Sequence, residues 1–180
     1  MKVEINKSMK LSEHFTLGEL CKTKHVTEDG NIPSHVAIEN LKRICENWLE
    51  DLRYSYNMLY VHSGVRPQSK VAGDCTLAPD PGAAPETEEA IVINSGYRSP
   101  EVNRLAGGAK TSNHLSGCAV DIRCAGKEQM IRYASILVDI ADGTKQEFDE
   151  LLLEQHGSVC WLHFAVRPKD NRRRIGFIRT

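Results

Sequence analysis

The chain has 180 residues, of which 41% are hydrophobic and 26% are charged, so it can bury a core of its own. Its 23 Lys and Arg residues nearly cancel its 24 Asp and Glu residues, which argues against a whole-chain field that attracts nucleic acid or an anionic membrane. No run reaches the roughly 20 apolar residues that a membrane span requires. We therefore expect a single soluble domain over residues 1–180 without a nucleic-acid partner. We take a monomer as the default, because the sequence carries no signal for the oligomeric state.

The N-terminus and the cysteines bear on the compartment. The first 15 residues contain no apolar run that could form the core of a signal peptide, which predicts synthesis in the cytoplasm without a signal peptide. Without such a signal, free thiols are favoured over disulfides for the six cysteines. No two of them have the Cys-x-x-Cys spacing of a zinc site.

The N-terminal half is predicted to be helical. Thr16 and Glu19 have the spacing of a capping box, which predicts a short helix after Phe15. Apolar residues recur at helical spacing over residues 34–54, which predicts a longer helix in the core. Residues 63–90 carry four prolines and few large apolar side chains, so we interpret them as an exposed insertion.

The C-terminal half alternates strands and helices. The pattern predicts strands over 90–94, 118–123, 147–153 and 159–166, and helices over 99–108 and 127–141. Residues 155–158 have the composition of a hairpin turn between the last two strands. A helical half followed by mixed strands and helices predicts an α+β fold. The arginine-rich stretch over 167–179 could bind an anionic polymer, but we interpret it as a solvated tail.

Asp121 is the anomaly within the predicted strand 118–123. Val120 and Ile122 flank it, and an ionised carboxylate in a buried strand is costly unless it is paired, hydrogen-bonded or bound to a metal. Arg123 shares a strand face with Asp121 by parity, so a plain ion pair is one explanation.

Two histidines offer another explanation. His114 lies in a polar turn before the strand of Asp121, and His163 lies among apolar residues in the last predicted strand. Two histidines and one aspartate match the three protein ligands of a catalytic zinc site, which leaves a fourth position for water. The alternative is a structural domain in which the three residues only fill core and ion-pair positions.

The residues around these positions resemble a known family. The pattern Ser112-x-His114-x-x-Gly117-x-Ala119-x-Asp121, followed by Trp161-Leu162-His163, is similar to the metal motif of the zinc D-alanyl-D-alanine carboxypeptidases and related wall endopeptidases, including phage endolysins. The resemblance continues upstream through residues 93–100, Asn103 and Gly107-Gly108, and weakly to residues 11–16. It covers most of the chain except the insertion at 63–90.

The resemblance implies a compact α+β fold of the hedgehog and D-alanyl-D-alanine peptidase type, with an antiparallel sheet and flanking helices. It implies one Zn²⁺ ion held by His114, Asp121 and His163. It also implies that Arg98 lies beside the metal and binds substrate, a role that its planar fork of donors suits. Ser112 would hydrogen-bond the substrate or hold the turn.

A water activated by zinc also needs a base. Relatives place an acidic residue three positions before the last histidine ligand, where this chain has Cys160, which is a poor substitute. A similar segment in the nearest subgroup has a glutamate at the position of Glu154, which would lie diagonal to His163 if it pairs with Trp161. Glu150 is the second candidate.

The resemblance therefore implies a zinc metallopeptidase that hydrolyses peptide bonds in cell-wall peptidoglycan, as a D-Ala-D-Ala carboxypeptidase or as a cross-link endopeptidase. Without a signal peptide, it would reach the wall by release, for example in phage or prophage lysis. Cys160 supports an alternative, a non-catalytic module that contains zinc, has lost the base, and binds wall peptide or a protein partner.

Overall fold

The first helices form where the sequence provides caps. In the computed structural model, which describes residues 6–61 and 88–179, the predicted capping box of Thr16 and Glu19 begins helix α1 (Leu17–Leu20). The Ser34 hydroxyl caps the next helix by accepting a hydrogen bond from the Ala37 amide. This helix continues without a break through α2 (His35–Ile44), the π-helical turn η1 (Cys45–Leu49), α3 (Glu50–Tyr56) and a second π-helical turn, η2 (Asn57–Val61).

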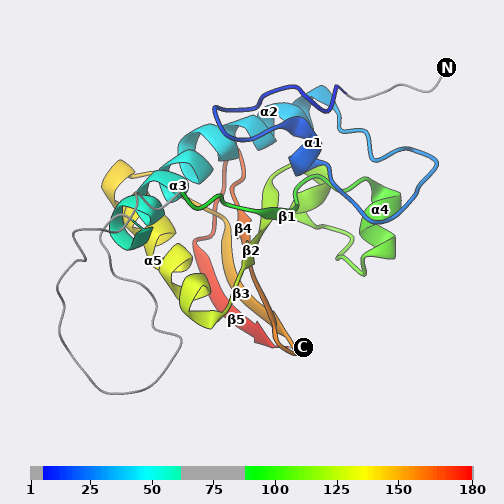
Figure 1. Cartoon of the computed structure of the whole chain (residues 1–180). Helices are drawn as coiled ribbons and strands as arrows, with labels where there is room; N and C mark the ends of the chain where they lie inside the picture. Colours follow the sequence, from blue (N-terminus) through cyan, green and yellow to red (C-terminus); the bar gives the residue numbers. More distant parts are fainter. Residues whose placement is uncertain (1–5, 62–87, 180) are drawn as a thin grey trace, which may run out of the picture.

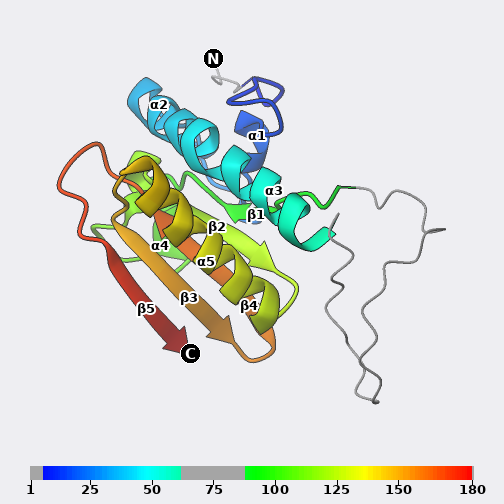
Figure 2. The same ribbon diagram turned by 90° about the vertical axis from the view of Figure 1, so that its left-hand side faces the viewer.

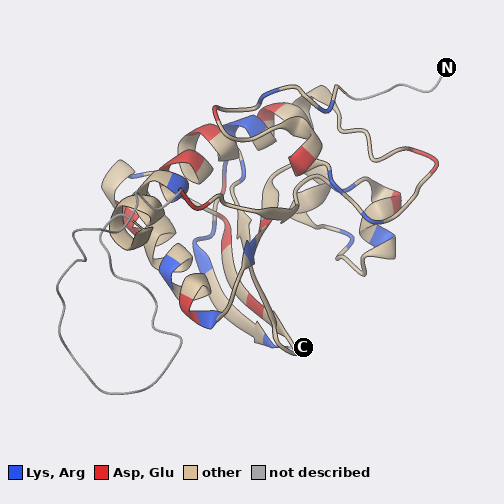
Figure 3. Ribbon diagram, viewed as in Figure 1, with Lys and Arg blue, Asp and Glu red and all other residues tan. Residues whose placement is uncertain are grey.

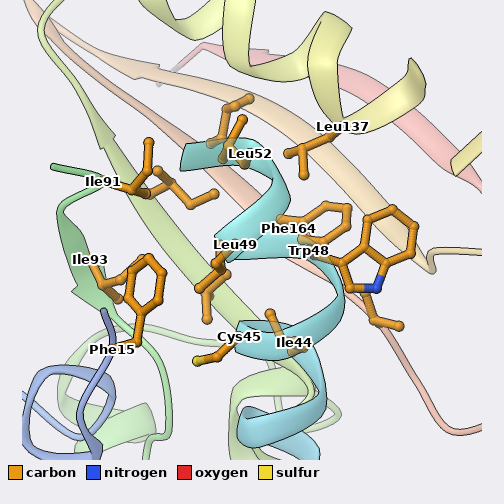
Figure 4. Packing of buried hydrophobic residues seen from close by; sticks show 14 of the residues in the cluster. Phe15, Ile44, Cys45, Trp48, Leu49, Leu52, Ile91, Ile93, Leu137 and Phe164 are labelled. Atoms are coloured by element: carbon orange, nitrogen blue, oxygen red, sulfur yellow. The ribbon is translucent and has the colours of Figure 1, made fainter. Parts of the chain in front are cut away.

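The predicted long helix is therefore confirmed, and its apolar stripe makes the core. Trp48, Leu49 and Leu52 are almost completely buried. The Trp48 ring meets Phe164 of the sheet edge-on, with 5.0 Å between the ring centroids (Figure 4). Packing of this kind fixes the sheet against the helix, so the opposite face of the sheet is left for a site.

Five strands form one sheet in the order β1-β2-β4-β3-β5. The pairs β1/β2, β2/β4 and β3/β4 are antiparallel, and β5 runs parallel to β3. The expected antiparallel sheet is therefore wrong at its edge, and the sheet is mixed. The strands are β1 (Ile93–Ser95), β2 (Ala119–Cys124), β3 (Glu150–His156), β4 (Val159–Ala165) and β5 (Arg174–Arg179).

The edge strand β5 also corrects the interpretation of residues 167–179 as a solvated tail. The backbone amides of Arg173 and Arg174 donate to the carbonyls of Phe148 and Asp149, which starts the pairing with β3. The charges are neutralised locally, since Arg172 lies 2.7 Å from a carboxylate oxygen of the fully buried Asp149. These arginines are thus part of the fold.

The remaining elements follow their sequence signals. Ser99 caps α4 (Pro100–Leu105), which has proline at its first position, and α5 is Lys127–Thr144. Gly157, with a φ of 57°, turns β3 into β4 as the hairpin signal predicted. Figure 1 shows α3 and α5 on one side of the sheet and α4 on the other, and Figure 2 shows α5 lying along the strands.

Other expectations are tested only within the described residues. All five cysteines described there are free thiols, as predicted, whereas Cys75 is outside them. The predicted insertion at 63–90 lies outside them except for positions 88–90, which have no regular secondary structure. No helix in residues 6–61 and 88–179 has the length and apolar character to cross a membrane.

Candidate metal centre

Three side chains from separate parts of the chain meet on the open face of the sheet. His114 precedes β2, Asp121 lies in β2, and His163 lies opposite Asp121 on β4. The Asp121 Oδ1 atom is 3.2 Å from His114 Nε2 and 3.0 Å from His163 Nδ1, and the two nitrogens are 3.2 Å apart. The three side chains expose only 2%, 10% and 12% of their surface. We call these three atoms the ligand triangle.

The ligand triangle has the dimensions of a zinc site. Nitrogen and oxygen atoms that lie 2.0–2.1 Å from a tetrahedral zinc ion are separated from each other by roughly 3.3 Å. A single proton can be shared by only two of these three atoms at a time, whereas one metal ion can be coordinated by all three. Two imidazole nitrogens and one carboxylate oxygen are also the donor types that zinc accepts at catalytic sites. The residues present therefore fit the metal.

A glycine in the turn before β2 sets the offset between the first two ligands. His114 lies in the 3-10 helix η3 (Asn113–Ser116), which Gly117 ends with a φ of 69°. A Cβ atom at Gly117 would lie 2.4 Å from the Ala37 carbonyl oxygen of α2. Glycine is needed here both for the left-handed backbone and for the close approach of the two segments.

The backbone at Gly96 orients the first ligand. His114 Nδ1 lies 2.5 Å from the Gly96 carbonyl oxygen, which can only accept, so Nδ1 holds the proton and Nε2 turns its lone pair to the triangle. The same loop is held by the Tyr97 amide, which donates to the Leu20 carbonyl at 2.7 Å, and by the Arg98 amide, which donates to the His114 carbonyl at 3.1 Å. The ring is therefore fixed before any metal binds.

Asp121 divides its two oxygens between the triangle and an arginine. Burial opposes its ionisation, but the His114 and His163 rings outweigh burial and hold the pKa of this carboxyl far below its usual range. The Arg98 guanidinium donates to Asp121 Oδ2, and its Nε donates to Ser95 Oγ at 2.8 Å. Arg98, and not the exposed Arg123 suggested by strand parity, is thus the arginine paired with Asp121.

His163 faces the triangle with one nitrogen and Glu150 with the other. Its Nε2 atom lies 3.6 Å from Glu150 Oε2. Burial disfavours the charged ring, but the hydrogen bond to Asp121 and the nearby carboxylate of Glu150 raise the pKa of His163 to about 9. A metal would displace the proton on Nδ1. Glu150, the second candidate for the base, is therefore placed behind a ligand ring.

The triangle opens into a cleft of about 570 Å³, which is within the size range of small-ligand sites. Glu154 lines this cleft. The strand register pairs it with Trp161 and pairs Leu152 with His163, so the predicted diagonal between Glu154 and His163 is confirmed. Burial raises the pKa of the Glu154 carboxyl, which suits a proton acceptor, although a bound cation would lower it again.

Cys160 cannot act in the cleft. It is three residues from His163 on one strand, and neighbouring residues on a strand alternate between faces, so the two side chains point in opposite directions. Cys160 lies opposite Cys124 in the core and is only 3% exposed. An acidic side chain at this position would enter the core, which leaves β3 to supply the carboxylate.

Ser112 holds the turn of the first ligand. Its hydroxyl accepts a hydrogen bond from the His114 amide at 3.3 Å and caps η3. It also lines the cleft, so a contact with substrate is compatible with its position.

Sequence reasoning missed the arginines at the cleft rim. Arg172 and Arg174 line the cleft and lie 3.0 Å and 3.2 Å from a Glu150 oxygen. Behind them, burial opposes the ionisation of Asp149, but hydrogen bonds from Arg172 and Asn113 lower its pKa to about 2. The sequence feature that could have indicated these arginines is the pair of adjacent acidic residues, Asp149 and Glu150, followed downstream by a run of arginines.

A comparison with known protein families gives one match to this chain. Residues 85–150 match the family model described as Peptidase M15. The match includes Arg98, Ser112, His114 and Asp121, and it ends before Glu154 and His163. A search of curated proteins found no significant match.

Proposed function

The Peptidase M15 match supports the membership of this chain in the superfamily of zinc D-alanyl-D-alanine carboxypeptidases, and on that basis we propose that it is a zinc metallopeptidase that hydrolyses peptide bonds in peptidoglycan. The ligand triangle of His114, Asp121 and His163 is the observation that carries the proposal. It joins two residues of the matched segment to a third that lies outside it.

The metal would be held by His114 Nε2, Asp121 Oδ1 and His163 Nδ1. A zinc ion with three such ligands lowers the pKa of a bound water to about 7 and polarises a carbonyl group. The protein residues around the triangle then have to orient the substrate and move protons.

Glu154 is the residue that we assign to proton transfer. It lies on the cleft face of β3, diagonal to His163, and Cys160 is excluded by its position in the core. Its carboxylate would take a proton from the attacking water and give it to the leaving amine. The half-buried environment, which raises the pKa of this carboxyl, favours holding that proton between the two steps.

Arg98 serves the site in two ways. Its Nε and Nη2 atoms are used by Ser95 and Asp121, which positions the ligand carboxylate. Its Nη1 atom has no hydrogen bond to any described residue and is left to bind a substrate oxygen. Ser112, at the edge of the same cleft, is the second substrate contact that we propose.

Hydrolysis of isolated peptidoglycan by the zinc-loaded protein tests the proposal. We expect new amine groups in the digest, and we expect His114→Ala to lose both zinc and hydrolysis. His35→Ala is the matched control, because the His35 side chain is 87% exposed on α2 and is not among the residues that line the cleft. Zinc uptake by the wild type without hydrolysis of any wall substrate would contradict the proposal and favour a module that only binds.

A further inference from the structure

The cleft continues past the ligand triangle. A second hollow, of about 480 Å³, shares four lining residues with the first, which are Arg98, Ala106, Asp121 and Trp161. Its walls come from the segment after α1, residues 22–25, from β1 and β2, and from α4 and its C-cap through Val102 and Ala106. We call it the β1 arm and the first hollow the β3 arm. Asp121 and Arg98 thus lie between the two arms, while His114 and His163 line the β3 arm alone, and we treat the two arms together as one groove.

Cations line the β1 arm. Lys22, Lys24 and Arg123 are exposed there, and Asp121 is the one acidic residue among its described lining residues. Asp121 is already used by Arg98 and the histidines. None of the three cations forms an ion pair with any acidic side chain in residues 6–61 and 88–179. Figure 3 shows Lys and Arg residues, in blue, on the loop after α1 and on β2.

The β3 arm is different, because its cations are already neutralised. Arg172 and Arg174 both lie within ion-pair distance of Glu150. Like charges that are gathered without a partner repel each other, and an anion that binds among them relieves this repulsion. The β1 arm is therefore the part of the groove that favours an anionic ligand.

A row of side chains connects the two arms across the sheet. Arg123 lies opposite Trp161 on β4, and Trp161 lies opposite Glu154 on β3. This row is adjacent to the row of Asp121 and His163. An extended peptide that passes over Trp161 would reach cations on one side and the proposed base on the other. The indole face would pack against the peptide.

We propose that the groove binds an extended peptide on both sides of the scissile bond, with a free carboxylate of the peptide held in the β1 arm by Lys22, Lys24 and Arg123. This inference rests on the proposed function. A carboxypeptidase needs room for only a terminal residue on one side, whereas two arms suit cleavage within a chain. Stem peptides of peptidoglycan carry carboxylates along their length, so the activity is that of an endopeptidase on acidic peptides.

Two forms of one stem peptide test the inference, one with its internal carboxylate free and one with that group converted to a carboxamide. We expect the wild type to have a KM about tenfold lower for the acid form, and the Lys22→Gln/Lys24→Gln/Arg123→Gln variant to lose this preference. Lys127→Gln, at an exposed lysine outside the groove, should keep it. The acid preference should also fall as salt is added.

Three outcomes would overturn the inference. These are an equal KM for the two forms in the wild type, an unchanged preference in the triple variant, and release of only the terminal residue from every substrate. The last would show a carboxypeptidase with one side of the groove unused.

Direct binding separates a failure of this inference from a failure of the proposed function. Trp161 lines both arms, while Trp48, the other tryptophan, is 1% exposed, so tryptophan fluorescence reports on the groove. In Glu154→Gln, we expect the acid form to bind about tenfold tighter than the amide. Tighter binding of the acid form by Glu154→Gln, together with no hydrolysis of any wall substrate by the zinc-loaded wild type, would refute the peptidase and keep the β1 arm. Hydrolysis by the wild type, together with equal binding of the acid and amide forms by Glu154→Gln, would keep the peptidase and refute the β1 arm.

Discussion

Each side chain of the ligand triangle has a second contact that fixes its orientation. His114 donates to the Gly96 carbonyl, Asp121 accepts from Arg98, and His163 faces Glu150. Contacts of this kind set the tautomer and the basicity of a ligand, and their loss typically costs about 10–100-fold in metal affinity. The residues behind the ligand triangle should therefore affect zinc binding as well as turnover.

Arg98→Ala should weaken zinc binding by about 10–100-fold, because Asp121 Oδ2 loses its charged donor. Titration of the apoprotein against a competing zinc indicator measures the affinity. Arg104→Ala, at an exposed arginine of α4, is the control and should bind zinc like the wild type. If Arg98→Ala keeps wild-type affinity but loses activity, the arginine acts on substrate alone.

Glu154→Gln should lower kcat by about 10²–10⁴-fold while zinc affinity is retained, because the amide keeps the shape of the side chain but cannot accept the proton. Steady-state hydrolysis of a stem peptide and zinc titration measure the two properties. Glu147→Gln, which changes a half-exposed carboxylate near Arg173, should leave both unchanged. Wild-type turnover in Glu154→Gln would remove this residue from the mechanism.

At the scale of elements, two connections between secondary-structure elements shape the site. The η3 turn ends at Gly117, where the backbone is left-handed and touches α2. The connection from β4 to β5 wraps around Asp149, which lies 2.9 Å from a nitrogen of Arg167 and 2.7 Å from one of Arg172. The first sets the position of His114, and the second holds the wall of the β3 arm.

Gly117→Ala should destabilise the protein by about 1–3 kcal/mol or more, because it adds backbone strain and a clash with the Ala37 carbonyl. Denaturant unfolding measures the change. Gly143→Ala is the matched control, since Gly143 lies in α5 with open space around it and should gain about 0.5–1 kcal/mol. A Gly117→Ala protein as stable as the wild type would refute the explanation of the glycine.

Asp149 should make the free energy of unfolding depend on pH in the acidic range. Its folded pKa of about 2 is below the ordinary value of about 3.9, so its contribution is complete above pH 4 and is lost as the pH falls to about 2. This difference in pKa corresponds to about 2–3 kcal/mol of stability. We expect Asp149→Asn to lower the free energy of unfolding at pH 7 and to flatten its decline between pH 4 and pH 2. Parallel curves for the two proteins would contradict this assignment.

At the scale of the whole molecule, features that are continuous in sequence could be predicted, whereas pairings between distant segments could not. The helix over 34–54 and the motif around His114 and Asp121 could be found because each is continuous in sequence. The β5 strand was missed, since arginines mask the alternation of Ile175 and Phe177, and its partner β3 lies more than ten residues upstream. The pairing of Asp121 with Arg98 was missed for the same reason, because strand parity points only to a neighbour.

A metal held at the ligand triangle would also couple the elements to each other. Its proposed ligands come from η3, β2 and β4, so a bound ion would stabilise only the folded arrangement of these segments. His163 is the decisive one among the proposed ligands, because it lies outside residues 85–150 and joins the triangle only through the fold.

Zinc stoichiometry and affinity of the wild type and of His163→Ala therefore test the central claim most directly. We expect one zinc per wild-type chain, and in His163→Ala an affinity loss larger than the roughly 10–100-fold of an outer contact such as Arg98. The exposed control His35→Ala should match the wild type. A wild type that binds no zinc, or a His163→Ala protein that binds it as tightly, would contradict the claim.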